Sequence, residues 1–140
     1  ICVDNSKRIV NFGLRKAKKN KLSNLEFRHG DIENPPLQAK SVDVSLLSQA
    51  LHHARNPEVA LLAAHRILRP GGKVIIIDLL EHNFSQAKNL YGDRWMGFAK
   101  NTLRDWLEKA GFKNVEIINV AREEEPPHFE TILATGTKPA

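Results

Sequence analysis

The sequence has 140 residues, of which 41% are hydrophobic and 26% charged, as in a single soluble globular domain. No stretch approaches the roughly 18 consecutive apolar residues that a membrane span needs, so we expect a cytoplasmic protein that makes no membrane contact. The one cysteine, Cys2, excludes a disulfide framework or a thiolate metal cluster within this chain, and its apolar neighbours predict a core position.

The formal net charge is +5, from 21 basic and 16 acidic residues. Many of the basic residues lie on or just after one predicted helix: Lys7, Arg8, Arg15, Lys16, Lys18, Lys19 and Lys21. We interpret this group as a solvated helix face and favour that over a phosphate-binding stripe. Direct nucleic-acid binding is therefore the minor alternative.

The first half of the chain alternates strands and helices. An apolar run at 1–4 predicts a strand, and Ser6 then caps a helix from about 6 to 20. The apolar residues of this helix share one face: Ile9, Val10, Leu14 and Ala17. Strands follow at 25–30 and 42–49, and between them Pro35 and Pro36 exclude both a helix and a central strand.

The next helix begins at Asn56 and Pro57 and runs to Leu68, where the sequence Arg69-Pro70-Gly71-Gly72 stops it. The run KVIIIDLL at 73–80 then predicts a central strand that is covered on both faces. The stretch 84–98 is partly helical in our interpretation.

A last helix is predicted around a capping box at Thr102 to Asp105 and ends at Gly111. Its inward residues are expected to be Leu103, Trp106, Leu107 and Ala110. Strands at 113–120 and 129–136 complete the chain. The repeated strand–helix–strand order predicts an open α/β fold with a mostly parallel sheet, whose last two strands pair as an antiparallel hairpin or splay apart.

Ligands of open α/β sheets bind outside the carboxyl ends of the strands. The predicted strands end in Asp4-Asn5, in His29-Gly30-Asp31, in the run from Ser48-Gln49 to His52-His53, and in Asp78 with Glu81-His82 close behind. Polar groups are therefore expected to gather at one rim of the sheet.

The two aspartates at this rim have alternative interpretations. Asp4 suits the two hydroxyls of a ribose, since a carboxylate can accept from both, but it also suits the dipole of the helix that follows. Asp31 follows a glycine and is equally compatible with turn formation.

The adjacent residues His52 and His53 should point in different directions, unlike the i, i+4 pair of helical metal sites, so no metal site is expected. Each is either an ordinary loop histidine or a substrate contact or base. Trp95 and Trp106 are predicted to be core or helix-packing residues rather than a substrate cage.

Four segments resemble class I S-adenosylmethionine-dependent methyltransferases, which have a Rossmann-like fold: VDNS, HGDIENPPL, SVDVSLLSQALHH and HRILRPGGKVIIID. The LRPGG turn is the most specific of them. The segments SQALHH, GDRWMGF and ETILATGTKP further resemble the methyltransferase half of proteins that fuse an ArsR-like repressor to a methyltransferase. The resemblance covers nearly the whole chain, which implies one methyltransferase-like domain over 1–140.

One part of the family pattern has no counterpart, namely its first strand with the glycine-rich loop. We therefore expect this chain to be the carboxyl-terminal part of a larger domain that binds the cofactor weakly or not at all on its own. The gap in the sheet would be closed by direct strand pairing, by exchange with a second copy in a homodimer, or by partial disorder. Nucleic acid would be contacted only through an additional N-terminal domain.

The resemblance implies S-adenosylmethionine as the cofactor and a small-molecule methyl acceptor. It implies that Asp4 binds the ribose, that Asn5 lies beside the adenine, that Asp31 and Ile32 flank the adenine, and that Ser48 and Gln49 lie near the methionine part. His52 and His53 would lie on the substrate side, and no catalytic base is assigned.

Three alternatives remain at this stage. The domain could be a regulatory module that senses the cofactor or a metabolite for an attached DNA-binding domain, or a dinucleotide-dependent oxidoreductase, which also uses an acid after its second strand. An arsenite methyltransferase is disfavoured, because its chemistry needs several thiolates and this chain has one cysteine.

Overall fold

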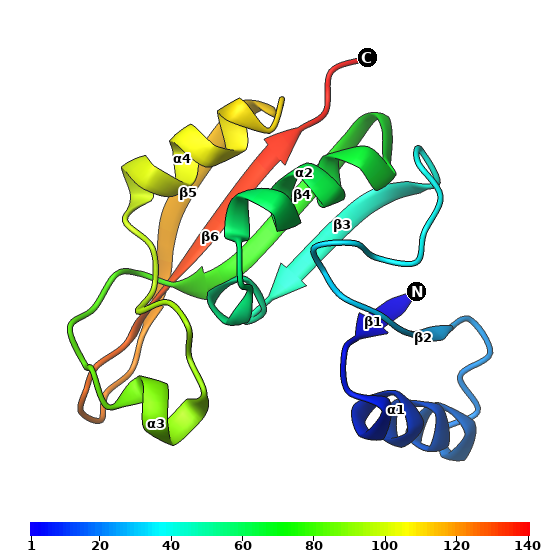
Figure 1. The fold of residues 1–140 in the computed structure, drawn as a ribbon, viewed down its shortest axis with the longest axis horizontal. Helices are drawn as coiled ribbons and strands as arrows, with labels where there is room; N and C mark the ends of the chain where they lie inside the picture. Colours follow the sequence, from blue (N-terminus) through cyan, green and yellow to red (C-terminus); the bar gives the residue numbers. More distant parts are fainter.

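A computed structural model describes all residues 1–140. The elements are, in chain order, β1 (Cys2–Asp4), α1 (Lys7–Lys19), β2 (Phe27–His29), β3 (Val42–Ser48), the 3₁₀ turn η1 (Leu51–His53), α2 (Pro57–Ile67), β4 (Leu68–Leu79), α3 (Ala87–Tyr91), α4 (Lys100–Lys109), β5 (Lys113–Arg122) and β6 (Glu130–Thr137). The predicted α/β class is confirmed (Figure 1). None of the helices has the length and apolar character needed to traverse a bilayer.

The strands form two separate sheets. β1 and β2 pair in parallel, and a four-stranded sheet has the order β3-β4-β6-β5. β3 and β4 are parallel, whereas β6 runs antiparallel to both β4 and β5. The antiparallel pairing of the last two strands is thus confirmed, and β6 also joins that pair to the central strand.

The two sheets do not hydrogen-bond to each other. β1 and β3 instead face a hollow of about 180 Å³ that is lined mainly by apolar side chains, among them Val3, Val44 and Ile67. In Figure 1 the unit of β1, α1 and β2 lies to one side of the larger layer. Direct pairing between these edges, one of the three expected ways to close the sheet, is therefore not what the structure adopts.

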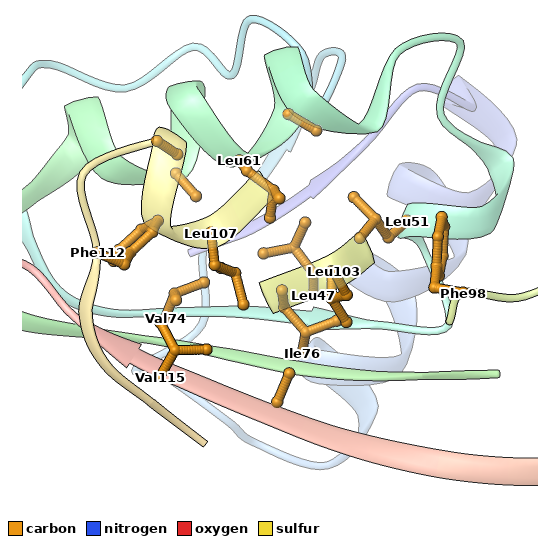
Figure 2. Packing of buried hydrophobic residues seen from close by; sticks show 14 of the residues in the cluster. Leu47, Leu51, Leu61, Val74, Ile76, Phe98, Leu103, Leu107, Phe112 and Val115 are labelled. Atoms are coloured by element: carbon orange, nitrogen blue, oxygen red, sulfur yellow. The ribbon is translucent and has the colours of Figure 1, made fainter. Parts of the chain in front are cut away.

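The main core lies between the four-stranded sheet and helices α2 and α4, in a cluster of 16 buried residues. Figure 2 shows Leu61 and Leu107 packed toward Val74 and Ile76 of the central strand. Burial along β4 alternates, because both helices cover the same face (Figure 1). The expectation that this strand is covered on both faces is therefore wrong.

Helix α1 begins as predicted, with the Ser6 side chain accepting a hydrogen bond from the Ile9 amide at 3.3 Å. Fewer residues of its apolar face are buried than predicted. Val10 and Ala17 are buried, but Ile9 remains 52% exposed. The reason is that α1 covers only the two short strands β1 and β2. For the same reason Cys2 is exposed, which corrects the expected core position.

Helix α2 begins as predicted, with Asn56 Oδ1 accepting from the Val59 amide and Pro57 in the first turn. The helix ends at Ile67, one residue before the predicted Leu68, and the predicted stop Arg69-Pro70-Gly71-Gly72 forms an irregularity at the start of β4, where the pairing jumps from Leu68 to Lys73 and Gly71 has φ +81°. Lys138 satisfies two carbonyls at the helix end, since its Nζ donates to the His65 and Leu68 carbonyl oxygens at 2.8 and 2.9 Å.

Helix α4 starts at Lys100, two residues before the predicted capping box, and no side chain caps its first turn. Leu103 and Leu107 face the core as predicted, and Gly111 with φ +99° follows the helix end. Trp95 and Trp106 meet edge to face at 5.8 Å between ring centroids, which confirms their packing role.

Candidate functional site

A polar hollow of about 500 Å³ lies at the carboxyl ends of β1, β2 and β3. All six residues assigned to cofactor binding line it: Asp4, Asn5, Asp31, Ile32, Ser48 and Gln49. They come from three strand ends that are as many as 45 residues apart in the chain. The parallel strand directions bring them together, as the rule for open α/β sheets requires.

Both aspartates combine a local role with a free oxygen. Asp4 Oδ1 accepts from the Ser6 amide at 2.8 Å, and Asp31 Oδ1 accepts from the Glu33 amide at 2.9 Å. These bonds are the turn and helix-start roles that the sequence left open. Each Oδ2 makes no hydrogen bond within the chain, so it can accept from a ligand hydroxyl or amine.

Gln49 is in the left-handed region, with φ +51°. Its backbone amide donates to the Ile77 carbonyl at 2.7 Å, which ties the turn after β3 to the neighbouring strand β4. Such a conformation costs a non-glycine residue of the order of 1–2 kcal/mol.

Three further residues of the rim were not predicted from the sequence. Arg55 donates its backbone amide to Glu33 Oε2 at 3.1 Å, which links two sides of the hollow. Arg94 reaches the hollow from the segment after α3. Arg94 lies within the stretch 84–98, whose structure the sequence pattern left ambiguous, and no motif marked it.

A second hollow of about 440 Å³ adjoins the first, with Gln49 and His53 bordering both. His52, Tyr91 and Phe129 also line it. The two histidines assigned to the substrate side therefore border a space next to the first hollow.

His52 is buried and is held by Asp78, a fully buried residue near the end of β4. The His52 Nδ1 and Asp78 Oδ1 atoms are 2.7 Å apart, while Asp78 Oδ2 accepts from the backbone amides of Leu51 and His52. Burial lowers the pKa of His52, but the hydrogen bond and the negative charges of Asp78 and Asp93 outweigh it, so the pKa is raised above its ordinary value.

The two histidine rings do not diverge as expected from their adjacency. Their centroids are 4.0 Å apart, and both Nε2 atoms face Asp93 Oδ1, at 3.5 Å from His52 and 3.9 Å from His53. The tight 3₁₀ geometry of η1 and the loop at Gly92–Asp93 bring the rings to this common point. The geometric reason for excluding a metal site therefore does not hold.

Comparisons with known proteins give a consistent picture. Residues 1–76 match the family described as "Methyltransferase domain". A 2-methyl-6-phytyl-1,4-hydroquinone methyltransferase of Spinacia oleracea is 30% identical over 106 residues, which cover 74% of this chain and 30% of that protein. An arsenite methyltransferase of Halobacterium salinarum is 29% identical over 123 residues, covering 84% and 32%.

Among solved structures, a phosphoethanolamine N-methyltransferase 2 of Haemonchus contortus in complex with S-adenosyl-L-methionine superposes with a TM-score of 0.81 at 15% identity. The match covers 99% of this chain and 43% of that one. At this identity the match establishes a shared fold. The chain spans about a third of the length of the curated relatives named above.

Proposed function

Because the chain belongs to the methyltransferase domain family, we propose that it takes part, within a larger protein, in transferring a methyl group from S-adenosylmethionine to a small-molecule acceptor. The observation that carries the proposal is that the six residues assigned to the cofactor line one polar hollow, while the assigned substrate-side histidines line the adjoining one.

In this proposal the free oxygens of the two rim aspartates bind the nucleoside. Asp4 Oδ2 accepts from ribose hydroxyls, and Asp31 Oδ2 accepts from the adenine amino group, with Ile32 against the ring. Ser48 and Gln49 then lie beside the methionine part. Asn5 completes the wall next to the adenine.

The cofactor supplies a methyl group on a sulfonium that is already activated for displacement. The protein has to hold the acceptor atom in line with that methyl, which is worth up to about 7–11 kcal/mol when the orientation is good. The hollow bordered by His52 and His53 is where the acceptor lies in this proposal. A base is needed only if the acceptor atom must lose a proton.

The test is calorimetric titration of the intact protein with S-adenosylmethionine, S-adenosylhomocysteine and NAD. Asp4→Asn should weaken binding of the first two by about 10- to 150-fold, from the 1.5–3 kcal/mol of a hydrogen bond to a charged group. Asp43→Asn is the matched control, since Asp43 is exposed on β3 outside the hollow. Equal affinity of the two variants, or a preference for NAD, would refute the assignment.

For the 140-residue chain alone we propose weak or absent cofactor binding, because the glycine-rich loop of the family has no counterpart in it. A micromolar dissociation constant for the chain alone would contradict this. The narrower proposal, that the larger protein also carries an ArsR-like repressor domain, rests on the resemblance of the SQALHH, GDRWMGF and ETILATGTKP segments alone.

The acceptor is best sought with labelled cofactor. The Spinacia oleracea relative is named for a hydroquinone, so quinols are the first acceptors to assay. Arsenite is the second, although the chain has a single, exposed cysteine with which to bind it. Cofactor binding without turnover on any acceptor would favour the alternative of a sensing module.

A further inference from the structure

We propose that His52, His53 and Asp93 form a binding site for a divalent transition-metal ion, and that zinc is the ion it fits best. One ligand atom from each residue, a ring nitrogen of each histidine and a carboxylate oxygen of Asp93, lies within 4.8 Å of the others. Imidazole nitrogen and carboxylate oxygen are the donors of many three-residue zinc sites.

The distances suit one shared ion. Ligands about 2.0–2.2 Å from a tetrahedral zinc ion lie about 3.3–3.5 Å from one another. The Asp93 Oδ1 atom is 3.5 Å from His52 Nε2 and 3.9 Å from His53 Nε2. The two distances to Asp93 therefore come within a few tenths of an ångström of that spacing.

The second nitrogen of each ring supports the same assignment. His52 Nδ1 faces Asp78 Oδ1 at 2.7 Å, and His53 Nδ1 faces the Gly92 carbonyl oxygen at 3.3 Å. Each of these oxygens accepts a hydrogen bond from a protonated Nδ1, which leaves the Nε2 lone pair directed at Asp93. Metal-bound histidines almost always make such a bond to a carboxylate or a carbonyl, because it fixes the tautomer and the ring orientation.

The Asp78 carboxylate is itself held in place. Its other oxygen accepts from the amides of Leu51 and His52, and the side chain is fully buried. An ordinary surface pair of histidine and aspartate would need none of this support. The arrangement thus has a preorganised ligand, His52, which the Asp78 carboxylate supports. Asp93 is the second ligand, and the partly exposed His53 is the third.

Three protein ligands leave a fourth position of a tetrahedral ion open. The residues border the second hollow, so this position faces the space assigned above to the methyl acceptor. There the ion would bind and acidify an acceptor hydroxyl. This last consequence rests on the proposed function, whereas metal binding does not.

The experiment is titration of the metal-free protein with zinc chloride by calorimetry, and with cobalt(II), whose visible absorption reports the coordination geometry. One equivalent of zinc should bind, and cobalt should give the strong absorption of a tetrahedral complex. His53→Ala should abolish both signals, and it leaves the core intact since this side chain is 45% exposed. Asp78→Asn should weaken zinc by about 10- to 100-fold.

His128→Ala is the matched control, because it removes an exposed histidine outside the cluster. It should leave both titrations unchanged. The proposal is overturned if the unaltered protein binds no stoichiometric zinc, or if His53→Ala and His128→Ala bind it equally. S-adenosylmethionine titrated in a separate experiment reports on the proposed function, so the two failures are distinguishable.

Discussion

Replacing Asp78 by alanine should destabilise the protein by about 3–5 kcal/mol. The carboxylate is fully buried and accepts four hydrogen bonds, from the Leu51, His52 and Leu79 amides and from the His52 ring. Each buried donor left without an acceptor costs about 1–3 kcal/mol, and breaking a buried charge pair costs about 3–5 kcal/mol. Adding the cost of every unsatisfied donor to that of the broken charge pair would give more than about 3–5 kcal/mol. We do not expect this larger loss, because the turn η1 can relax toward solvent.

The assay is urea denaturation, which gives the free energy of unfolding for each variant. Asp43→Ala is the control: this aspartate pairs with Arg69 at 2.9 Å but its side chain is 78% exposed, so its loss should cost below about 1 kcal/mol. Asp78→Asn retains one carbonyl acceptor and should lie between the two, which provides a measurement if Asp78→Ala does not fold. The reasoning is refuted if Asp78→Asn is as stable as Asp43→Ala.

Three further outcomes follow from the packing and the charges. Leu107→Ala removes a fully buried core side chain and should lower the free energy of unfolding, measured by urea denaturation, by about 2–5 kcal/mol. Leu90→Ala, at a side chain that is 62% exposed, should lower it by less than about 0.5 kcal/mol, and similar losses for the two variants would contradict the described core. Gly111→Ala should lower the thermal midpoint, because φ is +99° and an added Cβ would lie 3.0 Å from His65 Nε2; an unchanged midpoint would contradict this. Burial, and then the charge of Lys138, lower the pKa of His65, so its contribution to stability is complete above the unfolded pKa of about 6.5 and is lost as the pH falls through the folded pKa. His65→Gln should therefore lose less stability than the unaltered protein between pH 7 and pH 5, and an equal loss would disprove this role.

The site at the strand ends could be predicted because it depends on order and direction alone. Once the alternation of strands and helices establishes a parallel arrangement, residues such as Asp4, Asp31 and Ser48 must end at one edge. The structure places all three in one hollow. No side-chain detail was needed for that inference, only the place where each strand ends.

The features that the sequence did not predict depend on which face of an element is covered. The exposed Cys2 and Ile9 belong to the small unit of β1, α1 and β2, whose two strands offer little surface to pack against. The convergence of His52 and His53 on Asp93 depends on a loop about 40 residues further along the chain. No periodic pattern encodes such a contact, since it arises from the path of an irregular segment.

The register between β3 and β4 links the two hollows physically. Ser48 pairs with Ile77, and the Gln49 amide bonds to the Ile77 carbonyl, so the next residue of β4, Asp78, lies level with the turn that carries His52. A slip of one residue would turn the Asp78 side chain to the opposite face of the sheet and leave the turn without its acceptor. The same pairing that places Ser48 and Gln49 at the first hollow therefore also orients the His52 ring at the second. A change at the end of β4 should thus alter both hollows, whereas a change in the Gly92–Asp93 loop should alter the histidine cluster without disturbing this strand pairing.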